Sequence, residues 1–141
     1  MGVTITANNS SRSFDMGGGG FMSLRENIAL AFDKEFGEHY GKLRSVWKQE
    51  DFEIFDKETN RILADDRFQQ EDADIVEFLF MSDCGGEISH KTCKKIFDLI
   101  KDIDFGNKIF TYAGRSDGKD YQHFKEFLKE CYSNRRKMRW Y

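Results

Sequence analysis

The basic end of the chain carries the side chains that bind phosphate most specifically. Arg135 and Arg139 are four residues apart, so they share one face if the preceding helix continues through them. Two guanidinium groups at this spacing can hold a diphosphate through forked hydrogen bonds, and Asn134 stands beside them. A solvated basic tail is the alternative interpretation. The pair therefore predicts either a diphosphate site or a charged surface.

Two aromatic residues, Phe110 and Tyr112, lie in the segment 108–113, which has the clearest strand pattern in the chain. Residues two apart in a strand point to the same face, so both rings lie on one side. An aromatic ring on a sheet can stack on a nucleobase, whereas burial in the core is the alternative, above all for Phe110. Arg115 follows in a polar loop and adds a cation.

Four consecutive glycines, residues 17–20, precede a helical pattern that begins at Phe21. A helix that starts after a glycine-rich loop directs unpaired N–H groups and its positive end at an anion. Gly19, Gly20, Phe21 and Arg25 are thus candidates for a phosphate loop or a second ligand site. An ordinary turn is the alternative, because the run lacks the Lys-Ser/Thr of a Walker loop and the spacing of a dinucleotide fingerprint.

The remaining polar residues make no catalytic or metal-binding pattern. The three histidines are scattered, and none has a suitable partner three or four residues away. Cys84 lies near His90, but a thiol in a turn and a surface histidine explain this better than a nucleophile and its base do. The three cysteines fit neither a zinc motif nor a disulfide framework, which indicates a reducing cytoplasm. We therefore expect no enzyme, no metal and no cofactor.

Composition indicates one folded domain, residues 1–141, with one core. Hydrophobic residues make up 39% and charged residues 33%, and fourteen phenylalanines predict an aromatic core or an aromatic interface between subunits. The net charge of −3 argues against a coat for duplex nucleic acid. No apolar run approaches the roughly 18 residues of a membrane span, so we expect no membrane partner.

The periodicity of the sequence predicts an α+β fold, in which a small, mainly antiparallel sheet is packed with four or five helices. The expected strands are 3–6 and 13–16, which form a hairpin, and 108–113. The expected helices are 21–36, which Gly37 ends, 51–65, 71–81, 90–101 with Ser89 as N-cap, and 120–132. Trp140 and Tyr141 predict that the C-terminus packs onto something, such as a second subunit.

Three runs of the sequence resemble small proteins encoded by phages and prophages of Gram-positive bacteria. They are Asp15-Met16-Gly17-x-Gly19-Gly20-Phe21 with Leu24-Arg25; Ser82-Asp83-Cys84-x-Gly86-x-Ile88-Ser89 with Thr92-Cys93-Lys94; and Tyr112-Ala113-Gly114-Arg115-x-Asp117, then Lys137-Met138-Arg139-Trp140. On these runs the chain is similar, over nearly its full length, to the phage Thoeris anti-defence family.

The resemblance implies a sponge that binds a cyclic ADP-ribose isomer, made by a host TIR-domain enzyme, without cleaving it. It implies a homo-oligomer, a dimer or higher, in the host cell cytoplasm, and some members also bind cyclic oligonucleotides. The implied contacts are an aromatic on adenine, an Asn, and arginines on the phosphates. The candidates here are Phe110 or Tyr112, Asn134, and Arg135 with Arg139. The chain departs from the expected pattern at Gly18, where an aromatic would stand.

A second functional class stays open on the residues alone. A protein-interaction inhibitor would block a host defence enzyme directly, without any small molecule. The acidic middle of the chain, residues 50–77, can mimic nucleic acid in such a role, although its charges are dispersed among core phenylalanines.

Overall fold

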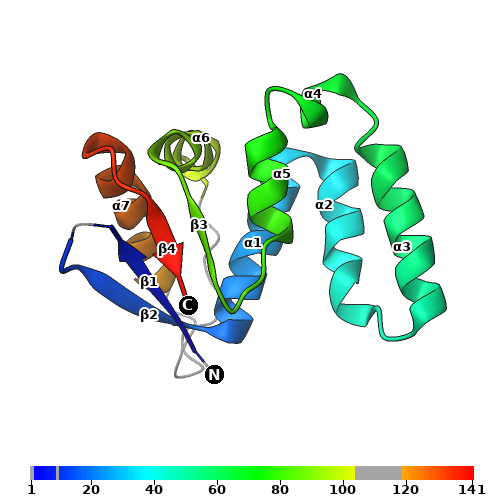
Figure 1. The fold of residues 1–141 in the computed structure, drawn as a ribbon, viewed down its shortest axis with the longest axis horizontal. Coiled ribbons are helices and arrows are strands. Elements are labelled where there is room, and N and C mark those ends of the chain that lie inside the picture. The colour runs from blue at the N-terminus through cyan, green and yellow to red at the C-terminus, as the bar shows by residue number, and fades with distance from the viewer. Residues whose placement is uncertain (1, 9, 104–118) are drawn as a thin grey trace.

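The computed structural model describes residues 2–8, 10–103 and 119–141 (Figure 1). The strands in these ranges are β1 (Gly2–Ala7), β2 (Ser13–Gly17), β3 (Gly86–Ile88) and β4 (Met138–Trp140). The helices are α1 (Gly18–Phe32), α2 (Lys34–Tyr40), the 3-10 helix η1 (Gly41–Ser45), α3 (Gln49–Ile62), α4 (Asp66–Gln69), α5 (Ala73–Phe80), α6 (His90–Ile100) and α7 (Lys119–Ser133). The α+β class predicted from the sequence is confirmed.

The sheet of the described residues is antiparallel, in the order β2-β1-β4-β3. The predicted N-terminal hairpin is present as β1 and β2, with Ile5 opposite Phe14. The predicted strand 108–113 lies outside the described residues. On its other side β1 pairs with β4, and the pairing extends to Tyr141, whose N–H donates to the Thr4 carbonyl at 3.0 Å. Both ends of the described chain thus meet in one sheet.

Side chains of the sheet alternate between a buried and an outer face. The buried face holds Val3, Ile5, Ala7, Met16, Ile88, Met138 and Trp140. Trp140 is 1% exposed, and its ring packs on Phe21 of α1 and Phe78 of α5, with ring centroids 5.8 and 5.5 Å apart. The C-terminal tryptophan is therefore part of this chain's own core, while Tyr141 beyond it is 66% exposed.

Gly86 on β3 leaves the space that the Trp140 ring occupies. A Cβ at position 86 would lie 2.3 Å from the Trp140 Cζ2 atom. The indole N–H then donates to the Ser82 carbonyl at 2.8 Å, which satisfies the polar atom of the buried ring. The turn 82–86 and the last strand are therefore held together by one side chain.

The part of the molecule that lies away from the sheet is helical. Figure 1 shows α2 and α3 side by side at the end far from the sheet, with α5 between them and the strands. Asp33 interrupts the helical pattern, because its carboxylate accepts the Phe36 N–H at 2.9 Å and caps α2. The sequence predicts that Gly37 ends a helix, and this prediction is wrong. In the structure Gly37 lies inside α2.

The position of Gly37 has a packing reason. A Cβ there would lie 2.5 Å from the Leu30 Cα atom, so glycine lets the backbone of α2 approach α1. The predicted helices 51–65, 71–81, 90–101 and 120–132 are present as α3, α5, α6 and α7 with shifted ends. Ser89 caps α6, since its hydroxyl accepts the Thr92 N–H at 3.3 Å. In the ranges described, no helix is long and apolar enough to cross a membrane.

Candidate functional site

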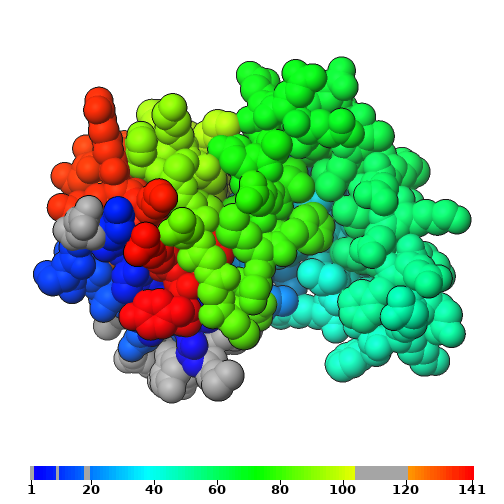
Figure 2. All heavy atoms as spheres, viewed as in Figure 1, coloured from blue at the N-terminus to red at the C-terminus, as the bar shows by residue number. Residues whose placement is uncertain are grey.

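A groove of about 360 Å³ lies between α2 with η1 on one side and α3 on the other, and we call it the α2–α3 groove. Its apolar lining comes from Val46, Ile54 and Phe55, and its polar lining from His39, Lys42, Asp51 and Glu58, with Ser45. Figure 2 shows that α3 forms the outer end of the molecule, opposite the strands. The groove is therefore on a surface that the sheet and the core leave accessible.

Helix α3 lines the groove because of its residue spacing. Phe55 and Ile62 are buried and hold α3 to the rest of the helices. Asp51, Ile54 and Glu58 follow one another at intervals of three and four residues, which places them along one line on the helix surface. Carboxylates in the first turn, such as Asp51, are stabilised by the positive end of the helix dipole.

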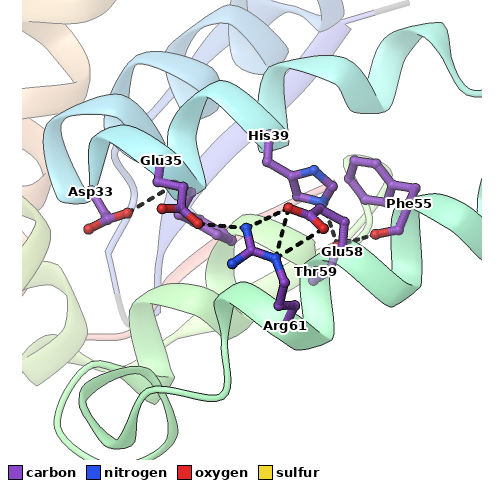
Figure 3. A network of polar contacts seen from close by, with 8 residues as sticks. Asp33, Glu35, His39, Phe55, Glu58, Thr59 and Arg61 are labelled. Atoms are coloured by element: carbon purple, nitrogen blue, oxygen red, sulfur yellow. Dashed lines mark hydrogen bonds and ion pairs between the residues drawn. The ribbon is translucent and has the colours of Figure 1, made fainter.

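His39 joins the two walls of the groove (Figure 3). Its ring stacks on Phe55 with the centroids 4.2 Å apart and the planes at 18°. Nε2 lies 2.7 Å from the Thr59 hydroxyl oxygen, and that hydroxyl donates its own proton to the Phe55 carbonyl at 2.8 Å. Nε2 must therefore be the donor to Thr59, so the neutral ring carries its proton there. Burial lowers the pKa of His39 below its usual 6.5, the carboxylate of Glu58 opposing this shift.

A second link between α2 and α3 runs through Arg61 (Figure 3). Its Nη2 atom lies 2.8 Å from a carboxylate oxygen of Glu35 and 2.6 Å from one of Glu58. Its Nε donates to both oxygens of Glu58 at 3.1 Å. The guanidinium holds the pKa of Glu58 below its usual value. Glu58, which lines the groove, is thus paired with a cation of its own chain at the surface.

The surroundings of the groove are acidic and expose large apolar side chains. Residues 47–58 contain five carboxylates and two lysines, a net charge of −3. Ile54 is 68% exposed, and Trp47, which follows Val46 directly in the chain, is 81% exposed. Phe52 on α3 is also exposed. This combination suits the binding of another molecule, because the apolar groups gain from burial and the carboxylates attract cations.

Two titratable groups of the groove, His39 and Glu58, are held by contacts within the chain. His39 contacts Thr59 and Phe55, and Glu58 holds Arg61. Among residues 2–8, 10–103 and 119–141, no three His, Cys, Asp or Glu side chains are placed to share a metal ion. The chemistry that the groove itself offers is burial of an apolar group beside the carboxylate of Asp51.

The C-terminal residues predicted to bind a diphosphate are not brought together as expected. Helix α7 ends at Ser133, so the shared helical face predicted for Arg135 and Arg139 is wrong. Arg135 has φ 53°, and the Arg136 N–H donates to the Cys131 carbonyl at 2.8 Å, which is the bonding of a Schellman helix end. The chain then turns into β4, where Arg139 lies on the outer face of the sheet.

The other predicted contacts of this group are separate. Asn134 donates its side-chain N–H to the Glu130 carbonyl at 2.9 Å. The Nε of Arg139 donates to Glu87 at 2.9 Å, and this guanidinium with Lys137 holds the pKa of Glu87 below its usual value. Phe110, Tyr112 and Arg115 lie outside the described residues. The nucleotide site built from these six residues stays a prediction.

The glycine run is the beginning of a helix and not a loop before one. Gly17 is the N-cap residue of α1, and Gly19 and Gly20 lie in its first turn. Phe21 is fully buried. Arg25 is 2% exposed, and its Nη2 donates to the carbonyls of residues 78, 79 and 81 at 3.2, 2.6 and 2.5 Å. The contacts described for Phe21 and Arg25 are internal to the core, and a phosphate at Gly19 and Gly20 stays a prediction.

The groove is not among the sites expected from the sequence. The available signal is Ile54, an apolar residue that directly follows Glu53 in the predicted helix 51–65. Comparison with known proteins adds no assignment: no protein-family model, curated protein or solved structure matches the chain.

Proposed function

We propose that this protein acts by binding a partner protein through the α2–α3 groove, as a protein-interaction inhibitor and not as an enzyme. The observation that carries the proposal is Ile54, which is 68% exposed at the edge of the groove. A single exposed isoleucine is ordinary on a protein surface. Ile54, however, adjoins an apolar lining that continues through Phe55 and Val46.

Trp47 supports the same proposal. Tryptophan is among the residues that contribute most to binding in protein interfaces, because it buries a large area with little loss of side-chain freedom. Trp47 is 81% exposed, whereas Trp140 is fully packed in the core, so the fold does not use the Trp47 ring for its own stability. Exposing such a ring gains nothing for an isolated chain, since its burial is favourable.

An inhibitor of this kind only has to bind its partner protein, and it needs no catalytic group. His39 holds α2 to α3 through Thr59, and Glu58 fixes the Arg61 guanidinium that reaches Glu35 of α2. Changing the roles of these two groups during a reaction would loosen the walls of the groove. An inhibitor needs only affinity and abundance, because mass action then keeps the partner occupied.

The test compares proteins captured from host cells by the wild type and by Ile54→Gln. Tyr141→Gln is the matched control, since Tyr141 is 66% exposed at the opposite, sheet end. We expect one protein to be captured by the wild type and by Tyr141→Gln, and to be lost with Ile54→Gln. Equal capture by all three variants would overturn the proposal. A groove occupied by a second copy would appear as an oligomer of the wild type alone in size-exclusion chromatography, and would also overturn it.

Sequestration of a cyclic nucleotide is the second candidate. The observation that favours it is Arg139, half exposed on the outer face of the sheet with Thr6 directly opposite on β1. A phosphate beside that hydroxyl would replace Glu87 as the partner of Arg139. The family resemblance suggests a cyclic ADP-ribose isomer in the host cytoplasm. The test follows the melting temperature with these isomers and with cyclic oligonucleotides, for the wild type and Arg139→Ala. Stabilisation that Arg139→Ala removes, with intact ligand recovered after denaturation, would support it; no shift would exclude it.

A further inference from the structure

The arrangement of charge and apolar surface along α3 indicates what kind of partner the α2–α3 groove takes. Asp51 precedes Ile54 by three residues and Phe55 by four, which is one turn of the helix. One turn spans about 5 Å along the helix axis. A carboxylate and an apolar lining therefore stand next to each other at this end of the groove.

The Asp51 carboxylate has no internal partner in the part of the chain that the structure describes. It makes neither an ion pair nor a side-chain hydrogen bond there, and the residue is exposed. Glu50 and Glu53 beside it add negative charge. An arriving cation would thus meet an accessible carboxylate in a field that favours it. Filling the groove would exclude water and strengthen that contact.

The other end of the groove is different. Glu58 is engaged by Arg61 through both carboxylate oxygens, and Lys42 lies near it on the opposite wall. A cation of the partner therefore has more to gain at Asp51 than at Glu58. The two ends of the groove therefore differ, and a partner would bind in the orientation that places its cation at Asp51.

The size of the groove limits what fills it. Its volume of about 360 Å³ lies at the low end of pockets that enclose a whole small ligand, and it opens on the surface beside Ile54. An apolar side chain inserted between Val46 and Phe55, with the rest of the partner outside, matches this volume better than an enclosed metabolite. Anchoring of this kind is common when an amphipathic helix docks in a groove.

We infer that the partner of the α2–α3 groove presents a basic amphipathic segment, in which a lysine or arginine stands one helical turn from a large apolar side chain. The cation pairs with Asp51, and the apolar side chain packs on Ile54 and Phe55. This inference rests on the proposed function, and it names the chemistry of the partner.

The experiment titrates the full-length protein with two synthetic amphipathic peptides without tryptophan, one of lysine and leucine and one of glutamate and leucine. Binding is followed by tryptophan fluorescence, because Trp47 is 81% exposed and Trp140 is 1% exposed. A Trp47→Phe variant identifies the signal. We expect the lysine peptide alone to bind, with a blue shift of the Trp47 emission.

Three variants separate the parts of the inference. Ile54→Gln removes the apolar contact without changing the charge, and we expect it to weaken the lysine peptide about tenfold. Asp51→Asn should weaken it several-fold and reduce the dependence on salt. Glu53→Gln is the control, since it changes the charge of the same helix by the same amount but does not line the groove, and it should bind like the wild type.

The outcomes show separately whether the basic partner segment or the proposed partner binding itself is wrong. Equal effects of Asp51→Asn and Glu53→Gln, or binding of the glutamate peptide, would overturn the inference. If neither peptide binds while capture from host cells still depends on Ile54, the groove takes a partner of other chemistry, and only the inference fails. If neither peptide binding nor capture depends on Ile54, the proposed function fails as well.

Discussion

The Nη2 atom of Arg25 on α1 lies 2.6 Å from the carbonyl oxygen of Leu79 on α5. A buried cation of one helix thus closes the C-terminal end of another, where the helix dipole is negative. The guanidinium also lies over the rings of Phe21 and Phe78, at 5.3 and 5.8 Å. Tyr40 adds its hydroxyl to the same carbonyl at 2.6 Å. The contact therefore joins α1 to α5, the helix that precedes the Ser82 turn to which Trp140 donates.

Arg25→Met should therefore destabilise the fold. It would leave the carbonyls at the end of α5 without this buried donor, and we expect the free energy of unfolding to fall by about 3 kcal/mol. Urea denaturation measures it. Arg12→Met, which removes an exposed ion pair with Glu130, is the control and should cost less than about 1 kcal/mol. A stable Arg25→Met protein that has lost anion binding would instead favour the phosphate-loop hypothesis.

His39 should make stability depend on pH. Its folded pKa is lowered by burial, so the unfolded chain takes up the proton first as the pH falls. The free energy of unfolding should therefore decrease as the pH drops below about 6.5, until the folded pKa is passed. Urea denaturation at pH 7.5 and 5.5 measures the difference, and His39→Gln should show a smaller one. An identical difference in both proteins would mean that other groups cause it.

Gly37→Ala should destabilise the protein although alanine favours helices. The new Cβ would meet the backbone of α1 at 2.5 Å, which no side-chain movement relieves. We expect a loss of about 2 kcal/mol or more. Gly41→Ala is the matched control: nothing lies within 4 Å of its Cβ, and its φ of −61° is helical. There we expect a gain of about 0.5 kcal/mol. Thermal unfolding of the two variants should shift in opposite directions.

Arg135→Gly should stabilise the protein. Arg135 ends α7 with φ 53°, a left-handed conformation that costs an L-residue about 1 kcal/mol and glycine very little. Arg135→Ala lacks the side chain but keeps the strain, so its stability should stay near that of the wild type. Denaturation curves compare the three proteins. If both variants also lose a bound cyclic nucleotide, the Arg135 side chain is a ligand contact; a loss in neither would remove it from that site.

The sequence by itself determined the elements whose rules are local. The hairpin of β1 and β2 follows from alternation and a turn, and α6 follows from an apolar stripe behind the Ser89 cap. The α+β class follows from these patterns together. Such rules act between residues a few positions apart, so a window of sequence contains them.

Only the tertiary structure decided the features that depend on distant partners. The strand β4 is three residues long, and its place between β1 and β3 comes from pairing across almost the whole chain. The sequence alone indicates that Gly37 ends a helix, and only the close packing of α1 shows why a glycine is needed there. The sequence alone indicates that Arg25 binds an anion, and only the fold shows that it donates to carbonyls at the end of α5. The α2–α3 groove needs two helices to exist, because a pattern within α3 shows which residues are apolar but not which of them a neighbour covers.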